Sequence, residues 1–185
     1  MAIYIAPYDP QWPAEYATEE ARIVGACRGL QIRLEHIGST AVPGLDAKPI
    51  IDILAGCPPR ADRADYIAAL RQLGYEHKGA FGIPGRNYFR RGSPRSHHVH
   101  MVSWSSGFWR DQLAFRDALR ADPALRQEYA TLKRDLARVH SEDVERYASA
   151  KGPFVRAVVR RALESADASS ITAGRAASIT TTEER

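Results

Sequence analysis

Residues 36–53 read His-Ile-Gly-Ser-Thr-Ala-Val-Pro-Gly-Leu-Asp-Ala-Lys-Pro-Ile-Ile-Asp-Ile, and this stretch decides the kind of fold that the chain adopts. Residues 32–37, which lead into it, alternate polar and apolar side chains as a strand does. Gly38 and Ser39 end that strand, and a loop rich in proline and glycine connects it to a second, nearly apolar strand over residues 50–54. A strand of this apolar density is covered on both faces, so the pattern predicts a sheet with helices packed against it.

The loop between the two strands has the composition of a phosphate-binding loop. Gly38 permits a close approach of backbone N–H groups, and the hydroxyls of Ser39 and Thr40 can add further donors. Lys48 can reach a phosphate, although it can equally be a solvated loop lysine. Each of these features also occurs in loops without a ligand, but their combination favours an active-site loop.

Asp52 is the one carboxylate in the second strand. An ionised carboxylate in an apolar strand is costly unless it meets a cation, a metal ion or several hydrogen-bond donors. A divalent ion that also coordinates nucleotide phosphate is one explanation, and hydrogen bonds from backbone N–H groups are the alternative.

A second candidate site lies in the basic stretch over residues 78–100, where Glu76 is the one acidic residue nearby. Arg86 and Arg90 share one face of a predicted strand over 87–90, and their guanidinium groups match phosphate oxygens. A predicted strand over 98–102 places His98 and His100 on one face, where they can ligate one metal ion or contact one phosphate. The alternative is an exposed basic strand and loop.

The rest of the chain predicts helices over residues 11–29, 62–73, 108–120, 122–139 and 141–164, the last with a possible break at 152–153. Residues 166–185 are rich in serine, threonine and alanine, and we expect them to be disordered in isolation. The fold class is therefore α+β, with one domain over residues 1–165 and a C-terminal tail.

Composition limits the partners. The net charge of +4 is a mild excess, so nucleic-acid binding is not predicted. No apolar run is long enough to span a bilayer, and the N-terminus lacks the features of a signal peptide. We therefore expect a cytoplasmic protein that does not bind a membrane, and the oligomeric state stays open.

The 36–53 stretch resembles the characteristic motif of the GrpB family, also called UPF0157. The resemblance covers about residues 3–163 and includes Tyr8 to Trp12, Leu73 to Tyr75, His97 to His100, Phe115 to Asp117, Glu128 to Lys133 and Tyr147 to Lys151. It implies a nucleotidyltransferase-like fold, with a short mixed sheet flanked by helices and a C-terminal helical part. It also implies transfer of a nucleotidyl group from a nucleoside triphosphate, with ATP the expected donor, to an unknown acceptor with the help of Mg²⁺ or Mn²⁺.

This chain departs from the pattern that such enzymes share. Asp52 matches the second of two paired carboxylates, but Ile50 stands where the first belongs, and His98 and His100 occupy the strand that should carry the third. Imidazole suits Zn²⁺ or Mn²⁺ better than Mg²⁺. Glu35 can supply the missing acid, or it can pair with surface residues.

In the helical part, the resemblance implies that Arg116, Lys133 and Lys151 can contact a triphosphate, whereas each alone reads as the charged edge of an amphipathic helix. The alternative function is a non-catalytic module that binds a nucleotide or a coenzyme A-like ligand, since some family members are fused to dephospho-coenzyme A kinase. The number of carboxylates at the site distinguishes transfer from binding alone. A Glu35 side chain close to Asp52 favours catalysis, whereas Asp52 as the one carboxylate favours binding.

Overall fold

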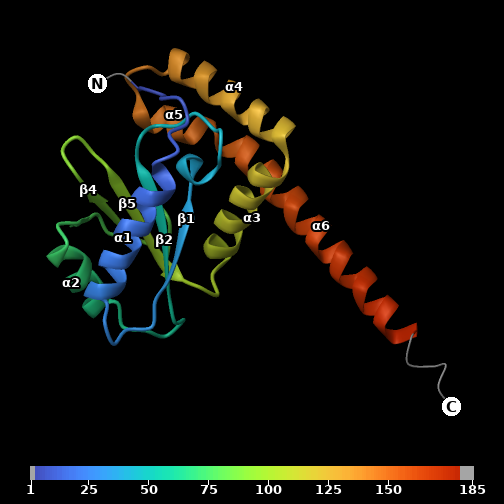
Figure 1. Cartoon of the computed structure of the whole chain (residues 1–185), viewed down its shortest axis with the longest axis horizontal. Coiled ribbons are helices and arrows are strands. Elements are labelled where there is room, and N and C mark those ends of the chain that lie inside the picture. The colour runs from blue at the N-terminus through green and yellow to red at the C-terminus, as the bar shows by residue number, and fades with distance from the viewer. Residues whose placement is uncertain (1–2, 180–185) are drawn as a thin grey trace.

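The computed structural model describes residues 3–179, and its centre is a five-stranded mixed sheet (Figure 1). The strand order is β1-β2-β5-β4-β3, with β2 and β5 parallel and every other neighbouring pair antiparallel. The strands are β1 (Arg33–Ile37), β2 (Ile51–Cys57), β3 (Glu76–His77), β4 (Asn87–Arg91) and β5 (His97–Ser103). This sheet with flanking helices confirms the predicted α+β class.

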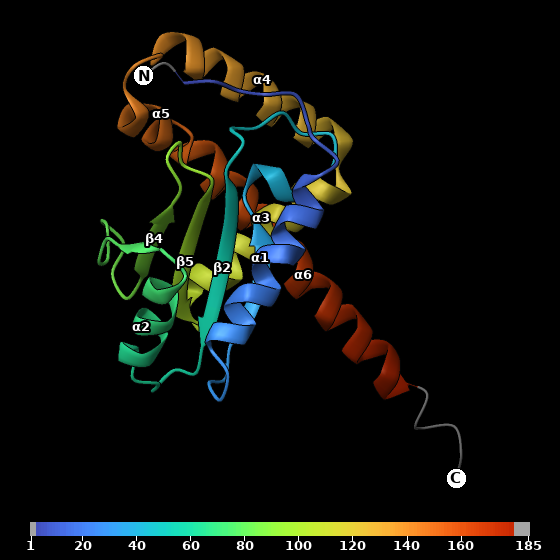
Figure 2. The same cartoon turned by 60° about the vertical axis from the view of Figure 1, so that its left-hand side comes forward.

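Helices cover both faces of the sheet. Helices α1 (Trp12–Ala26) and α2 (Ala64–Gln72) pack on one face over the largest apolar core, which contains Ile53, Phe89 and Val99. Helix α3 (Gly107–Ala121) packs on the other face, where Trp109 contacts a smaller core around Leu54. Figures 1 and 2 show α1 and α3 on opposite sides of the sheet. The predicted double covering of β2 is therefore observed.

The C-terminal part is helical, with α4 (Pro123–Val139), α5 (Val144–Ala150) and α6 (Gly152–Ile179). The Asp122 side chain accepts hydrogen bonds from the first N–H groups of α4, as expected for an N-cap. Tyr129 of α4 lies in a third core with Val42 and Leu45, so α4 packs against the loop that precedes β2. This contact brings the helical part to the end of the sheet where β2 and β5 begin.

Helix α6 continues to Ile179, and both views draw its last turns away from the sheet (Figures 1 and 2). It therefore enters the segment 166–185 for which disorder was expected. The domain limit at 165 and that disorder stay predictions, since residues 180–185 lie outside the described part of the chain.

Two short elements were not predicted from the sequence: β3, which has two residues, and a 3-10 turn over Ser39–Ala41. In addition, β2 extends to Cys57, three residues beyond the predicted end. Ala55, Gly56 and Cys57 stay extended because β5 pairs with them in register, a tertiary contact that local pattern does not contain.

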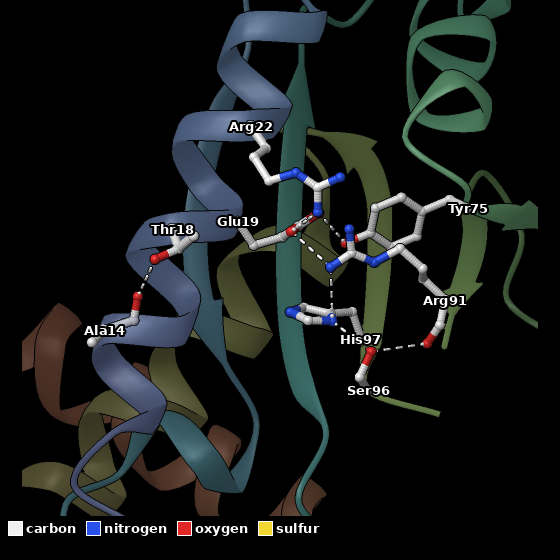
Figure 3. A network of polar contacts seen from close by, with 8 residues as sticks. All are labelled: Ala14, Thr18, Glu19, Arg22, Tyr75, Arg91, Ser96 and His97. Carbon is white, nitrogen blue, oxygen red and sulfur yellow. Dashed lines mark hydrogen bonds and ion pairs between the residues drawn. The ribbon is translucent and has the colours of Figure 1, made fainter. Parts of the chain in front are cut away.

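A buried carboxylate on α1 connects that helix to the sheet (Figure 3). Glu19, which is 2% exposed, accepts hydrogen bonds from Arg91 at 2.7 Å, Arg22 at 2.8 Å and the Tyr75 hydroxyl at 3.0 Å. Arg91 also lies 3.1 Å from the ring of His97. The network holds α1 against the end of β4 and the start of β5, next to the strand positions that carry the candidate site on the opposite face.

Candidate functional site

The register of the sheet brings the predicted site residues of three strands onto one face. Asp52 of β2 lies opposite His98 of β5, and His98 lies opposite Arg90 of β4. His100 follows two residues later on β5, with Tyr88 as its partner on β4. Because partners in register share a face, these side chains form one cluster at the starting end of β2 and β5.

Two histidines surround one oxygen of Asp52. His98 Nδ1 lies 3.0 Å from Asp52 Oδ1, and His100 Nε2 lies 3.5 Å from the same atom. Burial alone would raise the pKa of Asp52, but hydrogen bonds from His100 and His98 outweigh it and hold this pKa well below its usual range. Asp52 is therefore ionised at neutral pH.

Arg86 fixes the protonation of His100. Arg86 Nη1 lies 3.2 Å from His100 Nδ1, and a guanidinium group can only donate, so this ring nitrogen accepts. Burial lowers the pKa of His100, so the ring is neutral and has one proton. That proton is therefore on Nε2 and points at Asp52.

The nucleotidyltransferase resemblance implies a divalent ion, and the cluster fits one in part. Ligand atoms of Asp52, His98 and His100 lie within 4.8 Å of one another. Asp52 offers a carboxylate oxygen. His98 can present Nδ1 if its proton moves to Nε2, which is buried and has no hydrogen-bond partner among the described residues. His100 presents an N–H rather than a lone pair while Arg86 is in place, so it fits as a donor to Asp52 and not as a ligand.

The loop after β1 packs directly on Asp52. Gly38 has a φ of +72°, and a Cβ added there would lie 2.6 Å from Asp52 Oδ2, so both the conformation and the space require glycine. Ser39 Oγ accepts a hydrogen bond from Lys133 Nζ at 3.0 Å. Thr40 is 1% exposed, and its hydroxyl is already bonded to the Ile50 carbonyl and the His36 ring. The Thr40 hydroxyl thus supports the loop from within.

A cavity of about 760 Å³ opens over this cluster, between the sheet and the helical part. Its walls contain Asp52, His98 and His100 together with six cationic side chains, and the one other carboxylate is Glu145. The cations are Lys48, Lys78, Arg90, Arg95, Lys133 and Lys151. The cavity therefore has the charge of a site for an anion.

Three lysines from distant parts of the sequence meet at one end of this cavity. Lys133 is 2% exposed and also donates to the backbone carbonyl of Asp46, and burial lowers its pKa to about 7. Burial, together with the charge of Lys48, lowers the pKa of Lys151 to about 8. The ammonium groups of Lys48 and Lys151 lie 4.5 Å and 4.2 Å from the centre of the Tyr147 ring. Among the described residues, none of the three lysines forms a salt bridge within 4.0 Å.

Four residues predicted for the site do not line the cavity. One is Gly38, which packs on Asp52, and the other three are Glu35, Arg86 and Arg116. Glu35 accepts a hydrogen bond from Arg116 at 2.7 Å, and Arg116 also donates to the His36 carbonyl and to Asp117. Arg86 is 7% exposed and lies behind Tyr88 and His100. The structure therefore does not bring Glu35 to Asp52: the strand register pairs Glu35 with Leu54, and Arg116 of α3 binds the Glu35 carboxylate.

The sequence analysis did not assign Phe81, Glu145 or Tyr147 to the site, although all three line the cavity. Phe81 is in a glycine-rich loop whose course no local pattern gives. Tyr147 and Glu145 are on α5, and only the packing of the helical part places them over the sheet. Tyr147 falls within the family motif, which was the one signal available for it.

Comparison with known proteins gives the family of the chain. The family model described as GrpB protein matches residues 2–161. This chain belongs to the GrpB family. It is 41% identical to UPF0157 protein PA4798 of Pseudomonas aeruginosa, over 87% of this chain and 68% of that relative. The crystal structure of the conserved protein GrpB from Enterococcus faecalis is 34% identical with a TM-score of 0.80, and the match covers 88% of this chain and 98% of that one.

More distant matches are of two kinds. A dephospho-CoA kinase of Mycolicibacterium paratuberculosis is 30% identical over 89% of this GrpB chain, which spans 47% of that relative. The Cid1 poly(U) polymerase structure matches with a TM-score of 0.44 and 12% identity, over 70% of this chain and 44% of that one. Likeness at this level indicates neither an activity nor a substrate. Within residues 3–179, every helix is too short or too polar to cross a lipid bilayer.

Proposed function

We propose that this GrpB chain binds the polyphosphate of a nucleotide in the cavity and transfers the nucleotidyl group to a small-molecule acceptor, with ATP as the first donor to test. The observation that carries the proposal is the charge of the cavity, which has six cationic side chains and two carboxylates on its walls. A triphosphate supplies the negative charge that five of these cations lack within the described part of the protein, since only Lys78 forms a salt bridge there, with Glu76. Use of ATP also agrees with the expected cytoplasmic location.

The buried lysines favour an anion with several charges. Lys133 and Lys151 are held where burial lowers their pKa values to about 7 and about 8, so their surroundings in the protein disfavour the charged forms. A phosphate group beside them reverses this effect. The positions of Lys48, Lys133 and Lys151 around Tyr147 and Ser39 suit the far end of a triphosphate chain.

Asp52 marks the reactive end of the cavity. Asp52 and His98 would hold a divalent ion, with Mn²⁺ or Zn²⁺ fitting the nitrogen ligand better than Mg²⁺. When bound there, such an ion neutralises charge on the phosphate that is attacked. His100 donates to Asp52 Oδ1 and keeps this carboxylate ionised and fixed in place.

The second candidate function is binding without transfer, of a nucleotide or a coenzyme A-like ligand. Glu35 is bonded to Arg116 instead of facing Asp52, so the sheet cluster has one carboxylate where transfer enzymes of this type have more. The similarity to a dephospho-CoA kinase makes a coenzyme A precursor a reasonable second ligand. Both candidates need the same polyphosphate site.

Calorimetry with ATP, with and without Mn²⁺, tests the binding site. We expect the wild-type chain to bind ATP, and Asp52→Asn to abolish the part of the affinity that depends on Mn²⁺ while the fold is retained. Glu35→Gln is the matched control, because Glu35 is a carboxylate on the same sheet but does not line the cavity. Equal Mn²⁺-dependent affinity in wild type and Asp52→Asn would remove the metal assignment.

Release of pyrophosphate tests transfer. The wild-type chain is incubated with α-labelled ATP, Mn²⁺, Mg²⁺ or Zn²⁺ and pools of small metabolites. Transfer produces pyrophosphate and a labelled product, and Asp52→Asn produces neither. Tight ATP binding without pyrophosphate under every condition supports the binding function instead.

A further inference from the structure

Phe81 is an aromatic side chain exposed on the wall of the cavity. It is 48% exposed, whereas the two other aromatic side chains of the cavity wall, Tyr88 and Tyr147, are 6% and 2% exposed. Single exposed apolar side chains are common on protein surfaces, so the position of this ring on the cavity wall, and not its exposure alone, sets it apart. Among the described residues that line the cavity, Phe81 has the most exposed aromatic ring.

The backbone holds Phe81 in an unfavourable conformation. Its φ is +44°, which side chains other than glycine rarely adopt, although Gly79 and Gly82 stand close by in the same loop. Arg86 fixes this loop, since its guanidinium donates to the Ala80 carbonyl at 3.2 Å and to the Phe81 carbonyl at 2.7 Å. Hydrogen bonds within the protein thus hold the backbone that carries the ring.

The surroundings of the ring match those of a stacking surface beside a phosphate site. The Phe81 ring stacks on Tyr88 with centroids 5.2 Å apart, and Tyr88 is packed in turn against His98 and His100. The guanidinium of Arg90 lies 4.4 Å from the centre of the Phe81 ring. A flat group on Phe81 would therefore lie next to a cation that can contact phosphate.

We propose that Phe81 is the stacking platform for the planar ring of the ligand, which makes it the nucleobase subsite of the cavity. This inference rests on the proposed function. It adds that the cavity recognises an aromatic ring of the ligand as well as its phosphates. The lysines and arginines bind the polyphosphate, and Phe81 separates nucleotides from inorganic polyphosphate. Stacking tolerates different bases, so the subsite selects for an aromatic ring and not for one base.

Two probes separate this subsite from the phosphate site: ATP, which has both groups, and inorganic tripolyphosphate, which lacks the ring. We expect Phe81→Ala to weaken ATP binding by about tenfold or more, the usual effect of losing one base–aromatic contact. Tripolyphosphate affinity should stay within about twofold, because that ligand does not reach the ring. Phe81→Tyr keeps the aromatic ring and should restore ATP binding.

Val144→Ala is the matched control. Val144 is 50% exposed and lines the same cavity, but it has no ring. We expect this variant to bind both probes as the wild type does. Phe81→Leu retains most of the apolar volume of the side chain but has no aromatic ring. If stacking accounts for the contribution of Phe81 to ATP affinity, this variant should bind ATP as weakly as Phe81→Ala.

The outcomes are distinct. Wild type that binds neither probe overturns the proposed function, and the subsite with it. Wild type that binds both probes, with Phe81→Ala affecting the two equally or neither, retains the phosphate site and overturns the subsite alone. Full ATP affinity in Phe81→Leu also overturns it, because apolar volume would then be sufficient.

Discussion

Gly38 and Gly44 both have a positive φ, of +72° and +76°, but their surroundings differ. A Cβ at Gly44 meets nothing within 4 Å, whereas a Cβ at Gly38 meets the Asp52 carboxylate. Gly44→Ala should therefore lose about 1 kcal/mol of unfolding free energy from backbone strain alone. Gly38→Ala should lose more, and it should also lose the Mn²⁺-dependent part of ATP binding, because Asp52 must move.

Urea unfolding and calorimetry on the two variants measure this difference. The pair is informative because both glycines have a positive φ, whereas only Gly38 packs on Asp52, so an effect on ATP binding in Gly38→Ala alone points to the contact with Asp52. ATP affinity in Gly38→Ala equal to that of Gly44→Ala would show that the position of Asp52 does not matter for binding.

Lys133 and Lys151 make ligand binding depend on pH. Their pKa values in the free protein are about 7 and about 8, and a bound polyphosphate raises both. At pH 8 the free protein has both groups partly deprotonated, so binding takes up protons and affinity falls as pH rises from 7 to 9. Calorimetry of tripolyphosphate binding in buffers of different ionisation enthalpy measures the uptake. No proton uptake at pH 8 would contradict the assignment of these lysines to the anion.

For single residues, the sequence predicted that His98 and His100 lie near Asp52 but not what each of them does there. The alternation of a strand is enough to place His98 and His100 on one face. Arg86 reaches His100 from a loop, and only the folded structure reveals that the His100 N–H points at Asp52. For Glu35 the sequence left open a catalytic role and an ion pair, and it could not name Arg116 as the partner, which α3 brings to Glu35 across 81 residues of sequence.

Among the elements, the contact of α1 with the sheet depends on Glu19. Its carboxylate is buried and satisfies Arg91, Arg22 and Tyr75 at once (Figure 3). Glu19→Ala leaves the Arg91 guanidinium and the Tyr75 hydroxyl without this partner, and removing one member of a buried ion pair costs about 3–5 kcal/mol. We expect a loss of about 3 kcal/mol in unfolding free energy, because Arg22 is partly solvated.

Urea or thermal unfolding measures the loss. Glu15→Ala is the control, since Glu15 is an exposed residue in the first turn of the same helix, and it should change stability by less than about 1 kcal/mol. A loss in Glu19→Ala no larger than that of Glu15→Ala would mean that apolar packing alone holds α1 in place.

The ends of helices could be predicted from the sequence where a capping residue or a Gly-Pro pair marks them. Asp122 and Pro123 start α4 where the sequence predicts it, and the Gly152–Pro153 pair separates α5 from α6. The end of β2 was predicted too early, because its last three residues are held extended by β5 and not by their own pattern.

For the whole molecule, the site depends on contacts between the sheet and the helical part. Lys133 reaches Ser39 across 94 residues of sequence, and Tyr147 and Lys151 close the cavity from α5 and its C-terminal end. Periodicity predicts each of these helices as amphipathic but does not indicate which residues face the sheet. The family motif was the only sequence signal for this convergence.

In the proposed function, Lys151 contacts the ligand at some expense in stability. It is a cation held in a poorly solvated place near Lys48, with no salt bridge to a described carboxylate. Replacing such a group by an apolar one of similar shape is often neutral or stabilising, so Lys151→Met should keep or raise the unfolding free energy at pH 7, by up to about 2 kcal/mol. The same change should weaken tripolyphosphate binding at least about fivefold, because one phosphate contact is lost.

Lys78→Met is the control for stability: Lys78 forms a salt bridge with exposed Glu76, and its loss should change stability by less than about 1 kcal/mol. Thermal unfolding and calorimetry of the two variants decide the point, since a Lys151→Met protein that is less stable and binds tripolyphosphate normally would make Lys151 a structural residue.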